Sequence, residues 1–424
     1  MTSSVHATEQ LVFTVLLQLI VMIGAARAMH VLFRRLGQPG AVGEIIAGLM
    51  LGPSLLGWVA PDLSLWLFGD KPSPAITILS QVGLCLLMFQ IGSEFEFGHL
   101  KQRQAKNAAA LVATASLVVP FALGLLLGWW SQPALAPAID RTIYSLFVGV
   151  ALAITALPIL GRILVQFDLN RHPLGVIAIS AAAVNDVVGW LLLAAISALA
   201  AAAFTVEGKL IQVGALIALL LVARYALAPL ANWLVRKYPV EDGTLSPTLM
   251  AIALIIIFAL SIATYKLGIF AIFGGFIAGL LFHRHTAFVE AWRRQVGGFV
   301  LVFFLPIFFT FTGLRTDVLG LAGDFHWLAI VLALAILGKI VPVYLAARAT
   351  GLAPAESWTL GALMNTRALM ELVVLNVGYD LGFLPQSMFS MLVVMAVVTT
   401  LMTGPLLQLL LPRIGHKPAR VIEA

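Results

Sequence analysis

The chain has 424 residues, of which 61% are hydrophobic and only 10% are charged, and its mean hydropathy is +1.03. Soluble domains carry roughly 25% charged residues, so this composition excludes a soluble globular protein. The net charge is +6, but the basic residues form no patch or stripe of the kind that binds nucleic acid. They lie in short clusters between apolar runs, which is typical of a polytopic membrane protein.

The single cysteine, Cys85, lies inside an apolar run, so neither an intrachain disulfide nor a cysteine-based zinc site is possible. The first ten residues hold no basic segment ahead of the apolar stretch that begins at Leu11. We interpret this stretch as a retained membrane span rather than a signal peptide. No motif in the chain calls for a cofactor, and the only metal we expect is a transported monovalent cation.

Thirteen apolar segments are long enough to be candidate membrane helices, which need about 20 residues each. In chain order they are 11–33, 41–60, 75–94, 107–130, 142–166, 174–204, 209–235, 247–267, 269–283, 297–314, 327–349, 355–378 and 387–411. Sixteen lysines and arginines lie in the loops of one side, five in those of the other, and four inside spans. Because basic loops stay in the cytoplasm, we expect an outside N-terminus and a cytoplasmic C-terminus. We interpret the chain as a single membrane domain, 1–424, that ends in a short tail, 412–424.

Two short patterns recur in the same order along the chain. Residues 43–49 resemble 274–280, and the segment 87–92 resembles 308–313. In the predicted topology the paired spans run in opposite directions, which favours an inverted repeat of six spans around a connecting one. Inverted repeats are typical of secondary transporters, which bind substrate near the midplane at broken helices. The alternative is that small-residue packing patterns recur in any helical membrane protein.

Four spans carry a polar residue at the same depth, namely Thr155, Asp186, Lys339 and Arg367. Each lies about twelve residues into its span, roughly 18 Å at 1.5 Å per residue, where a charge costs ~2.5–3.5 kcal/mol. Asp186 offers a carboxylate that can bind either a desolvated cation or a proton. We predict that it is the ion site; the alternative is a permanent ion pair to Lys339 or Arg367.

Two neighbours of this depth offer further oxygen ligands. Pro158 cannot donate a backbone hydrogen bond and clashes with the preceding turn, which frees carbonyl oxygens near Thr155. These carbonyls and the threonine hydroxyl are hard ligands for a cation, although proline also kinks membrane helices for packing alone. Asn185 is either a second ligand, through its carbonyl oxygen, or a helix–helix hydrogen bond.

The span 355–378 carries the densest polar cluster. Arg367 and Glu371 are spaced i, i+4, so on a helix they share a face and neutralise each other. Asn365 and Thr366 are able to satisfy backbone groups at a helix break, which would mirror the break at Pro158. Lys339, from the preceding span, is expected to balance charge in the same core, by pairing with a carboxylate, competing with the cation or bonding to Asn185.

These segments together resemble the monovalent cation–proton antiporter superfamily, specifically its second branch, which includes the plant cation/proton exchangers and the Kef-like bacterial transporters. The motifs that carry the resemblance are 43–54 in outline, 86–89, 155–158, 185–186, 312–317, 338–339 and 364–372. The resemblance implies an all-α, inverted-repeat antiporter fold with two crossed discontinuous helices. It also implies a homodimer, with a mobile ion-binding core (107–204 and 327–411) and a scaffold with the dimer interface (11–94 and 209–314).

The resemblance further implies roles for single residues. Asp186 would bind the ion and the proton, Thr155 would help to ligate, and Lys339 and Arg367 would balance charge. The sequence departs from the family pattern at two positions. Ala368 stands where the similar motif usually has glycine, so we expect a less sharp helix break there. Asn185 occupies the position that is aspartate in electrogenic relatives, so the exchange is expected to be electroneutral.

The sequence therefore predicts a secondary antiporter that exchanges Na⁺ or K⁺ for H⁺ at Asp186 by alternating access. Residue types leave the choice of ion open, because selectivity depends on cavity size and ligand field. The alternatives are a Kef-type K⁺ efflux pathway and a sodium-coupled organic-anion carrier on a related fold. An intramembrane enzyme is disfavoured, because no span contains a His-Glu-x-x-His motif and Asp186 has no second mid-membrane aspartate. We expect a multi-pass protein of a bacterial inner membrane, with lipid around it.

Overall fold

The computed structural model describes residues 2–69, 72–94, 103–169, 172–201, 214–215, 217–267 and 270–416. Its regular elements there are helices: α1 (Thr2–Arg35), α2 (Gly40–Leu51), α3 (Leu56–Val59), α4 (Pro61–Phe68), α5 (Pro74–Ser93), α6 (Arg103–Leu135), α7 (Arg141–Ala153), α8 (Leu157–Gln166), α9 (Pro173–Ala201), η1 (Ala223–Leu227), α11 (Ala228–Lys237), α12 (Pro247–Lys266), α13 (Ala271–Phe282), α14 (Thr286–Trp292), η2 (Arg293–Gly297), η3 (Val300–Phe304), α15 (Leu305–Leu314), η4 (Leu319–Asp324), α16 (Phe325–Ala349), α17 (Pro354–Met364), α18 (Leu369–Asp380), α19 (Gln386–Leu410) and η5 (Leu411–Ile414).

The helices confirm a multi-pass membrane protein. Within the described ranges, nine helices are long and apolar enough to cross a bilayer, and two bent helix pairs raise the number to eleven. The predicted count of thirteen is not confirmed, since α13, for example, has 12 residues and a crossing helix needs about 20. The end of the span predicted at 174–204, the start of the one at 209–235 and the tail beyond 416 lie outside the described residues.

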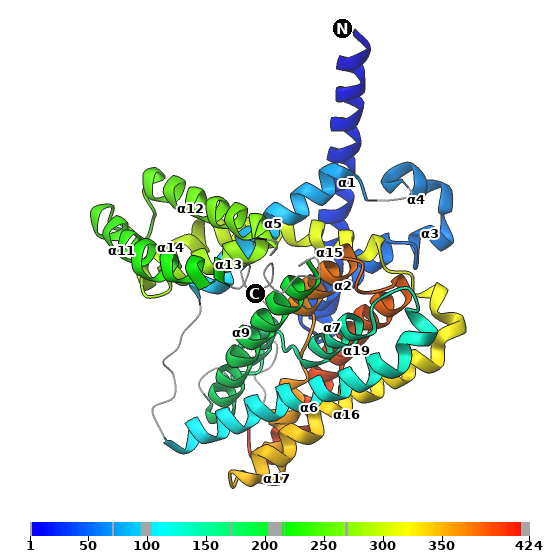
Figure 1. The fold of residues 1–424 in the computed structure, drawn as a ribbon, viewed down its shortest axis with the longest axis vertical. Helices are drawn as coiled ribbons and strands as arrows, with labels where there is room; N and C mark the ends of the chain where they lie inside the picture. Colours follow the sequence, from blue (N-terminus) through cyan, green and yellow to red (C-terminus); the bar gives the residue numbers. More distant parts are fainter. Residues whose placement is uncertain are drawn as a thin grey trace. The chain divides into compact units, whose positions relative to one another are not determined.

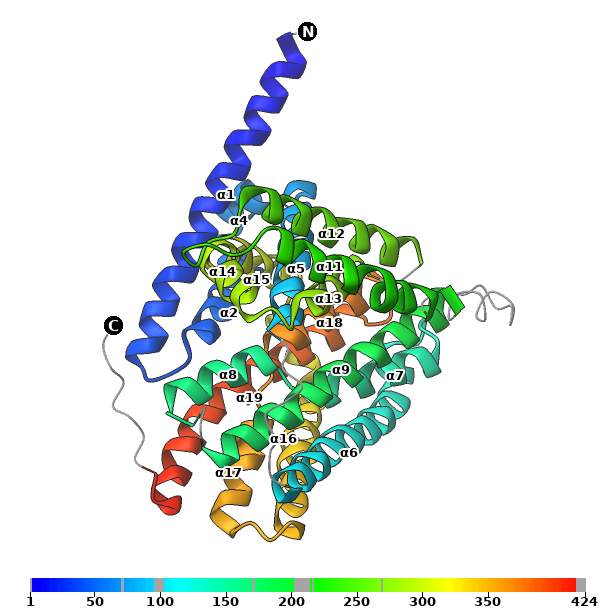
Figure 2. The same ribbon diagram turned by 90° about the vertical axis from the view of Figure 1, so that its left-hand side faces the viewer.

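The chain divides into two compact units, of which the first comprises Met1–Ile23, Pro72–Phe97 and Ala194–Phe311. Here α5 packs against α13, and α12 packs against both (Figure 2). A Cβ atom on Gly279 would lie 2.2 Å from the carbonyl oxygen of Phe89, so only glycine lets the two backbones approach this closely. The pattern 274–280 therefore serves helix packing in this unit.

The second unit comprises Gly24–Lys71, Gly98–Leu193 and Thr312–Ala424, and it holds every predicted site residue. In it, α6 packs against α7 and α16, and α17 packs against α16 and α19 (Figure 1). The contact of α6 with α7 is again made by glycine, because a Cβ on Gly124 would lie 2.6 Å from the Cα of Gly149. The division into a mobile core and a scaffold stays a prediction.

Candidate ion-binding site

The predicted span 142–166 is discontinuous. The helix α7 ends at Ala153, the chain is extended at Ile154 (φ −63°, ψ 143°), and α8 begins at Leu157. Pro158 lies in the first turn of α8. Backbone N–H groups in the first turn have no acceptor within the helix, so the missing N–H of proline costs no hydrogen bond there. Residues 154–156, between the two half-helices, therefore each have a backbone N–H or C=O group that makes no hydrogen bond within a helix.

The predicted span 355–378 is broken as well. The helices α17 and α18 are bent by 41° at Asn365–Ala368. Ala368 has a φ of 89°, in the left-handed region that glycine tolerates and alanine does not. The surrounding packing holds this fully buried residue in a strained conformation, and the expectation that alanine makes the break less sharp than glycine would stays a prediction. The two discontinuous helices of the predicted fold are therefore present.

The two breaks contact each other. The backbone N–H of Ala156 donates a hydrogen bond to the carbonyl of Thr366, with 3.1 Å between N and O. On the other side, α19 supplies hydroxyl groups: the N–H of Arg367 donates to Thr400 Oγ1 at 3.2 Å, and Thr403 Oγ1 lies 3.5 Å from Thr366 Oγ1. Unwound backbone in a membrane must find partners inside the protein, and these bonds supply them.

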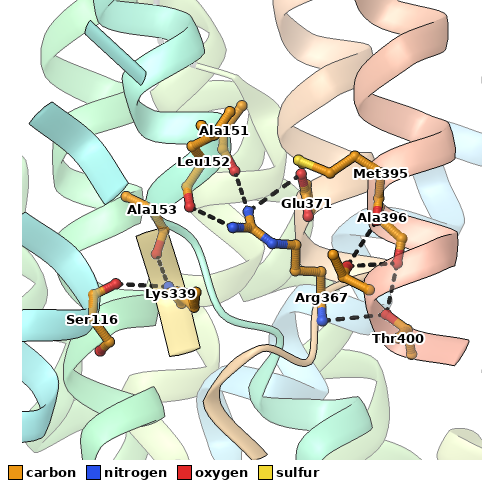
Figure 3. A network of polar contacts seen from close by, with 11 residues as sticks. Ser116, Ala151, Leu152, Ala153, Lys339, Arg367, Glu371, Met395, Ala396 and Thr400 are labelled. Carbon is orange, nitrogen blue, oxygen red and sulfur yellow. Dashed lines mark hydrogen bonds and ion pairs between the residues drawn. The ribbon is translucent and has the colours of Figure 1, made fainter. Parts of the chain in front are cut away.

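The two buried cations both bind the end of α7 (Figure 3). Arg367 donates from Nη1 to the carbonyl of Ala151 at 2.9 Å and from Nη2 to that of Leu152 at 2.7 Å. Lys339 Nζ donates to the carbonyl of Ala153. Because a helix carries partial negative charge at its C-terminus, the cations neutralise the end of a half-helix that stops in the buried interior of this unit. The predicted charge balance thus involves backbone carbonyls as well as side chains.

The two acidic residues of the cluster differ in their surroundings. Glu371, fully buried in the first turn of α18, forms an ion pair with Arg367 at 3.7 Å, although its two carboxylate oxygens make no hydrogen bond among the described residues. Asp186, on α9, is 3% exposed, and neither of its carboxylate oxygens has a hydrogen-bond partner among the described residues. The backbone N–H of Leu157, at the start of α8, points toward this carboxylate, and the charge of Lys339 attracts it. A buried carboxylate without a hydrogen bond is costly, so this one is suited to bind a cation or a proton.

Further oxygen atoms near the breaks are also unpaired. Thr155 Oγ1, Asn185 Oδ1 and the side-chain amide of Asn365 are buried, and within the described ranges they have no hydrogen-bond partner. Thr155 lies in the unwound segment after α7, and Asn365 lies in that after α17. A desolvated cation needs such oxygen atoms in place of its hydration shell.

Sequence reasoning missed Ser116, a fully buried residue of α6. Its hydroxyl accepts a hydrogen bond from Asn185 Nδ2 at 2.7 Å, and its carbonyl accepts one from Lys339 Nζ at 2.7 Å. The signal that could have found it is a hydroxyl near the middle of the span 107–130. Serine is common in membrane helices, so this signal alone is weak.

The motif 312–317 anchors the far end of α18. Arg315 forms an ion pair with Asp380 at 2.6 Å, and Asn376 Nδ2 donates to Thr312 Oγ1 at 2.7 Å. Since α18 begins next to Arg367, these contacts hold the helix at the end opposite to the break. This motif therefore positions α18.

Comparison with known proteins identifies the family. Residues 19–412 match the family described as sodium/hydrogen exchanger, transmembrane. The chain is 37% identical over 415 residues to Na(+)/H(+) antiporter NhaS4 of Synechocystis, covering 95% of this chain and 98% of that protein. It is 34% identical over 407 residues to Cation/H(+) antiporter 18 of Arabidopsis thaliana, covering 96% and 49%. It is 30% identical over 406 residues to K(+)/H(+) antiporter 1 of Saccharomyces cerevisiae, covering 94% and 46%.

The chain thus spans about half the length of the plant and yeast relatives. Among solved structures, the sodium proton antiporter MjNhaP1 of Methanocaldococcus jannaschii matches with a TM-score of 0.65 at 15% identity, covering 95% of this chain and 98% of that one. This match confirms the predicted antiporter fold, and the family match confirms the resemblance seen in the sequence. The chain belongs to the sodium/hydrogen exchanger family of transmembrane transporters.

Proposed function

We propose that the protein is a secondary antiporter that exchanges a monovalent cation for H⁺ at Asp186. The observation that carries this proposal is the buried carboxylate of Asp186, which in the described part of the chain has neither a hydrogen-bond partner nor an ion pair, whereas Glu371 is paired with Arg367. The names of the relatives support the substrate class, since they include Na⁺, K⁺ and unspecified cations. Na⁺ and K⁺ are therefore both candidates, and the test below ranks them.

The exchange follows from competition for one carboxylate. An ionised, buried Asp186 needs a positive partner, and a proton and a metal cation cannot occupy it together. Thr155 Oγ1 and Asn185 Oδ1 are buried oxygens that would add ligands for the cation. Each passage of the site across the membrane then carries either a cation or a proton, which couples the two fluxes.

We further propose that the exchange is electroneutral. Arg367 and Lys339 donate to the last carbonyls of α7, and Arg367 also forms an ion pair with Glu371; in this proposal all three residues keep their charges throughout the cycle. Only Asp186 changes its occupant, and one proton replaces one monovalent cation. In proteoliposomes whose membrane potential is set to different values by K⁺ diffusion, the transport rate is expected to be the same at every potential. A transport rate that changes with the membrane potential would contradict this stoichiometry.

The motion would be alternating access, with the core 107–204 and 327–411 moving against the scaffold 11–94 and 209–314. The shared fold with a known antiporter supports this division. We propose a homodimer in a bacterial inner membrane, with the N-terminus outside and the C-terminus cytoplasmic, as the basic loops favour. Labelling of the single-cysteine variants Ser3→Cys and Arg420→Cys in intact cells, each in a Cys85→Ser background, tests the orientation.

The decisive experiment uses proteoliposomes with an acidic interior and a pH-sensitive dye. Addition of Na⁺, K⁺ or Li⁺ is expected to collapse the pH gradient for wild type but not for Asp186→Asn. Asp140→Asn is the matched control, because Asp140 is an exposed N-cap whose side chain accepts from Ile143 N, and asparagine caps helices equally well. A gradient that collapses equally in Asp186→Asn would refute the proposed site. Currents at channel rates would instead favour an efflux channel.

A further inference from the structure

Ser116 joins two residues of the polar core through two different groups. Its side chain contacts Asn185, the residue before the proposed ion-binding aspartate, whereas its backbone carbonyl contacts Lys339. All three residues are fully buried and come from three helices, α6, α9 and α16. The two contacts can therefore be separated by mutation, since only one of them depends on the side chain.

The hydroxyl proton of Ser116 is already in use. Ser116 Oγ lies 3.1 Å from the carbonyl of Ala113, one turn earlier in α6, and donates to it. A serine hydroxyl has one proton but two lone pairs, so toward Asn185 it is able only to accept. The structure accordingly places the NH₂ group of Asn185, Nδ2, 2.7 Å from Ser116 Oγ. With the opposite orientation of the amide, Oδ1 would have to compete with the carbonyl of Ala113 for the one hydroxyl proton.

The amide orientation determines what Asn185 offers the site. With Nδ2 held by Ser116, the carbonyl oxygen Oδ1 is left buried and, among the described residues, without a hydrogen-bond donor. We propose that Ser116 is a positioning residue that holds the Asn185 amide so that Oδ1 is available to the bound cation beside Asp186. This inference rests on the proposed exchange at Asp186, and it names a residue that sets the affinity of the Asp186 site for the cation.

The variant Ser116→Ala tests the proposal, because it removes the acceptor for Nδ2 and keeps the carbonyl that binds Lys339. The amide is then free to rotate, and Oδ1 is no longer held in place. We expect the apparent KM for the cation to rise about tenfold, the scale of one lost buried hydrogen bond, with the maximal rate within about twofold of wild type. Because protons then compete more successfully, activity at a fixed cation concentration should shift to higher pH.

The control is Ser131→Ala, which deletes another fully buried serine hydroxyl of α6, bonded to Tyr144 Oη at 3.1 Å. It is expected to leave KM and the pH profile unchanged. Ser116→Thr, which keeps the hydroxyl, should restore the wild-type KM. In an Asn185→Leu background, Ser116→Ala should have no further effect on KM, because the amide that it orients is absent.

Two results are distinguishable. If Asp186→Asn abolishes exchange and folded Ser116→Ala retains the wild-type KM, the positioning role is refuted and the proposed function stands. If Asp186→Asn exchanges normally, the proposed function itself fails. Should Ser116→Ala not fold, Ser116→Cys offers a weaker acceptor, and an unchanged KM in that variant would equally refute the proposal.

Discussion

The carbonyl of Thr366 accepts a hydrogen bond from the N–H of Ala156 at 3.1 Å. This single bond joins the unwound segments of two discontinuous helices that lie about 200 residues apart in the chain. Next to it, Arg367 reaches across to the carbonyls of Ala151 and Leu152. Arg367, at the break between α17 and α18, thus supplies the positive charge that stabilises the end of α7. Each break therefore provides hydrogen-bond partners for the backbone of the other.

Arg367→Met is expected to destabilise the fold by about 3–5 kcal/mol, the cost of leaving a buried charge unpaired. The substitution leaves Glu371 without its cation and the carbonyls of Ala151 and Leu152 without a donor. Thermal unfolding in detergent measures the loss. The double variant Arg367→Met, Glu371→Gln should recover part of it, because it removes the unpaired charge; equal losses in the single and double variants would show that Glu371 is not charged.

Ala368→Gly is expected to stabilise the protein by roughly 1 kcal/mol. Ala368 has a φ of 89°, a conformation that costs a residue with a Cβ about 1–3 kcal/mol and costs glycine almost nothing. Ala362→Gly is the matched control, since Ala362 is a buried alanine inside α17, where glycine costs about 0.5–1 kcal/mol. A lower melting temperature for Ala368→Gly would contradict the strained backbone.

Asn376→Leu is expected to cost about 1–3 kcal/mol of stability, because the side chain keeps its size and loses two buried hydrogen bonds, besides the longer contact of Oδ1 with Arg315 Nη1 at 3.4 Å. Those bonds run from Nδ2 to Thr312 Oγ1 and to the carbonyl of Leu372. By contrast, Asp380→Asn should cost less than about 1 kcal/mol, because the ion pair between Asp380 and Arg315 is partly exposed. Melting curves of both variants compare the two; the reverse order would refute the anchoring role of Asn376.

His172 makes the turn between α8 and α9 sensitive to acid. Burial and the nearby His416 lower its pKa below 6.5, and Glu356 on α17 opposes this shift. Its Nδ1 accepts from the N–H of Leu174 at 3.3 Å, which requires that nitrogen to be unprotonated. The neutral form is therefore favoured in the folded state, and stability present above about pH 6.5 is lost as the pH falls through the lowered pKa.

His172→Asn tests this titration, because asparagine accepts the same backbone N–H without binding a proton. Between about pH 7.5 and about pH 5.5, the melting temperature of wild type should fall more than that of the variant. His326→Asn, which removes a histidine of α16 and leaves the turn between α8 and α9 intact, is the matched control. If the melting temperature falls equally with pH in wild type and His172→Asn, protonation of His172 beside His416 does not contribute to acid sensitivity.

Several features of this protein follow from local properties of the chain. Apolar length and the placement of basic residues determine a polytopic helical protein, because a span must bury a stretch of about 20 residues. The break before Pro158 follows from the missing N–H of proline, and the pairing of Arg367 with Glu371 follows from their i, i+4 spacing. The burial of Asp186, Lys339 and Arg367 follows from their depth in apolar spans.

The backbone partners of the buried cations were decided by the tertiary structure alone. The sequence pointed to Glu371 for Arg367, which the structure pairs with it, and to a carboxylate, the cation or Asn185 for Lys339. It gave no sign that both side chains donate to the carbonyls of residues 151–153, and Lys339 also to that of Ser116. A backbone carbonyl carries no signature of its residue type, and the end of α7 becomes an electrostatic site only when α18 and α16 pack against it. The role of Ser116 is of the same kind, because a serine becomes informative only when the fold places Asn185 and Lys339 on its two oxygens.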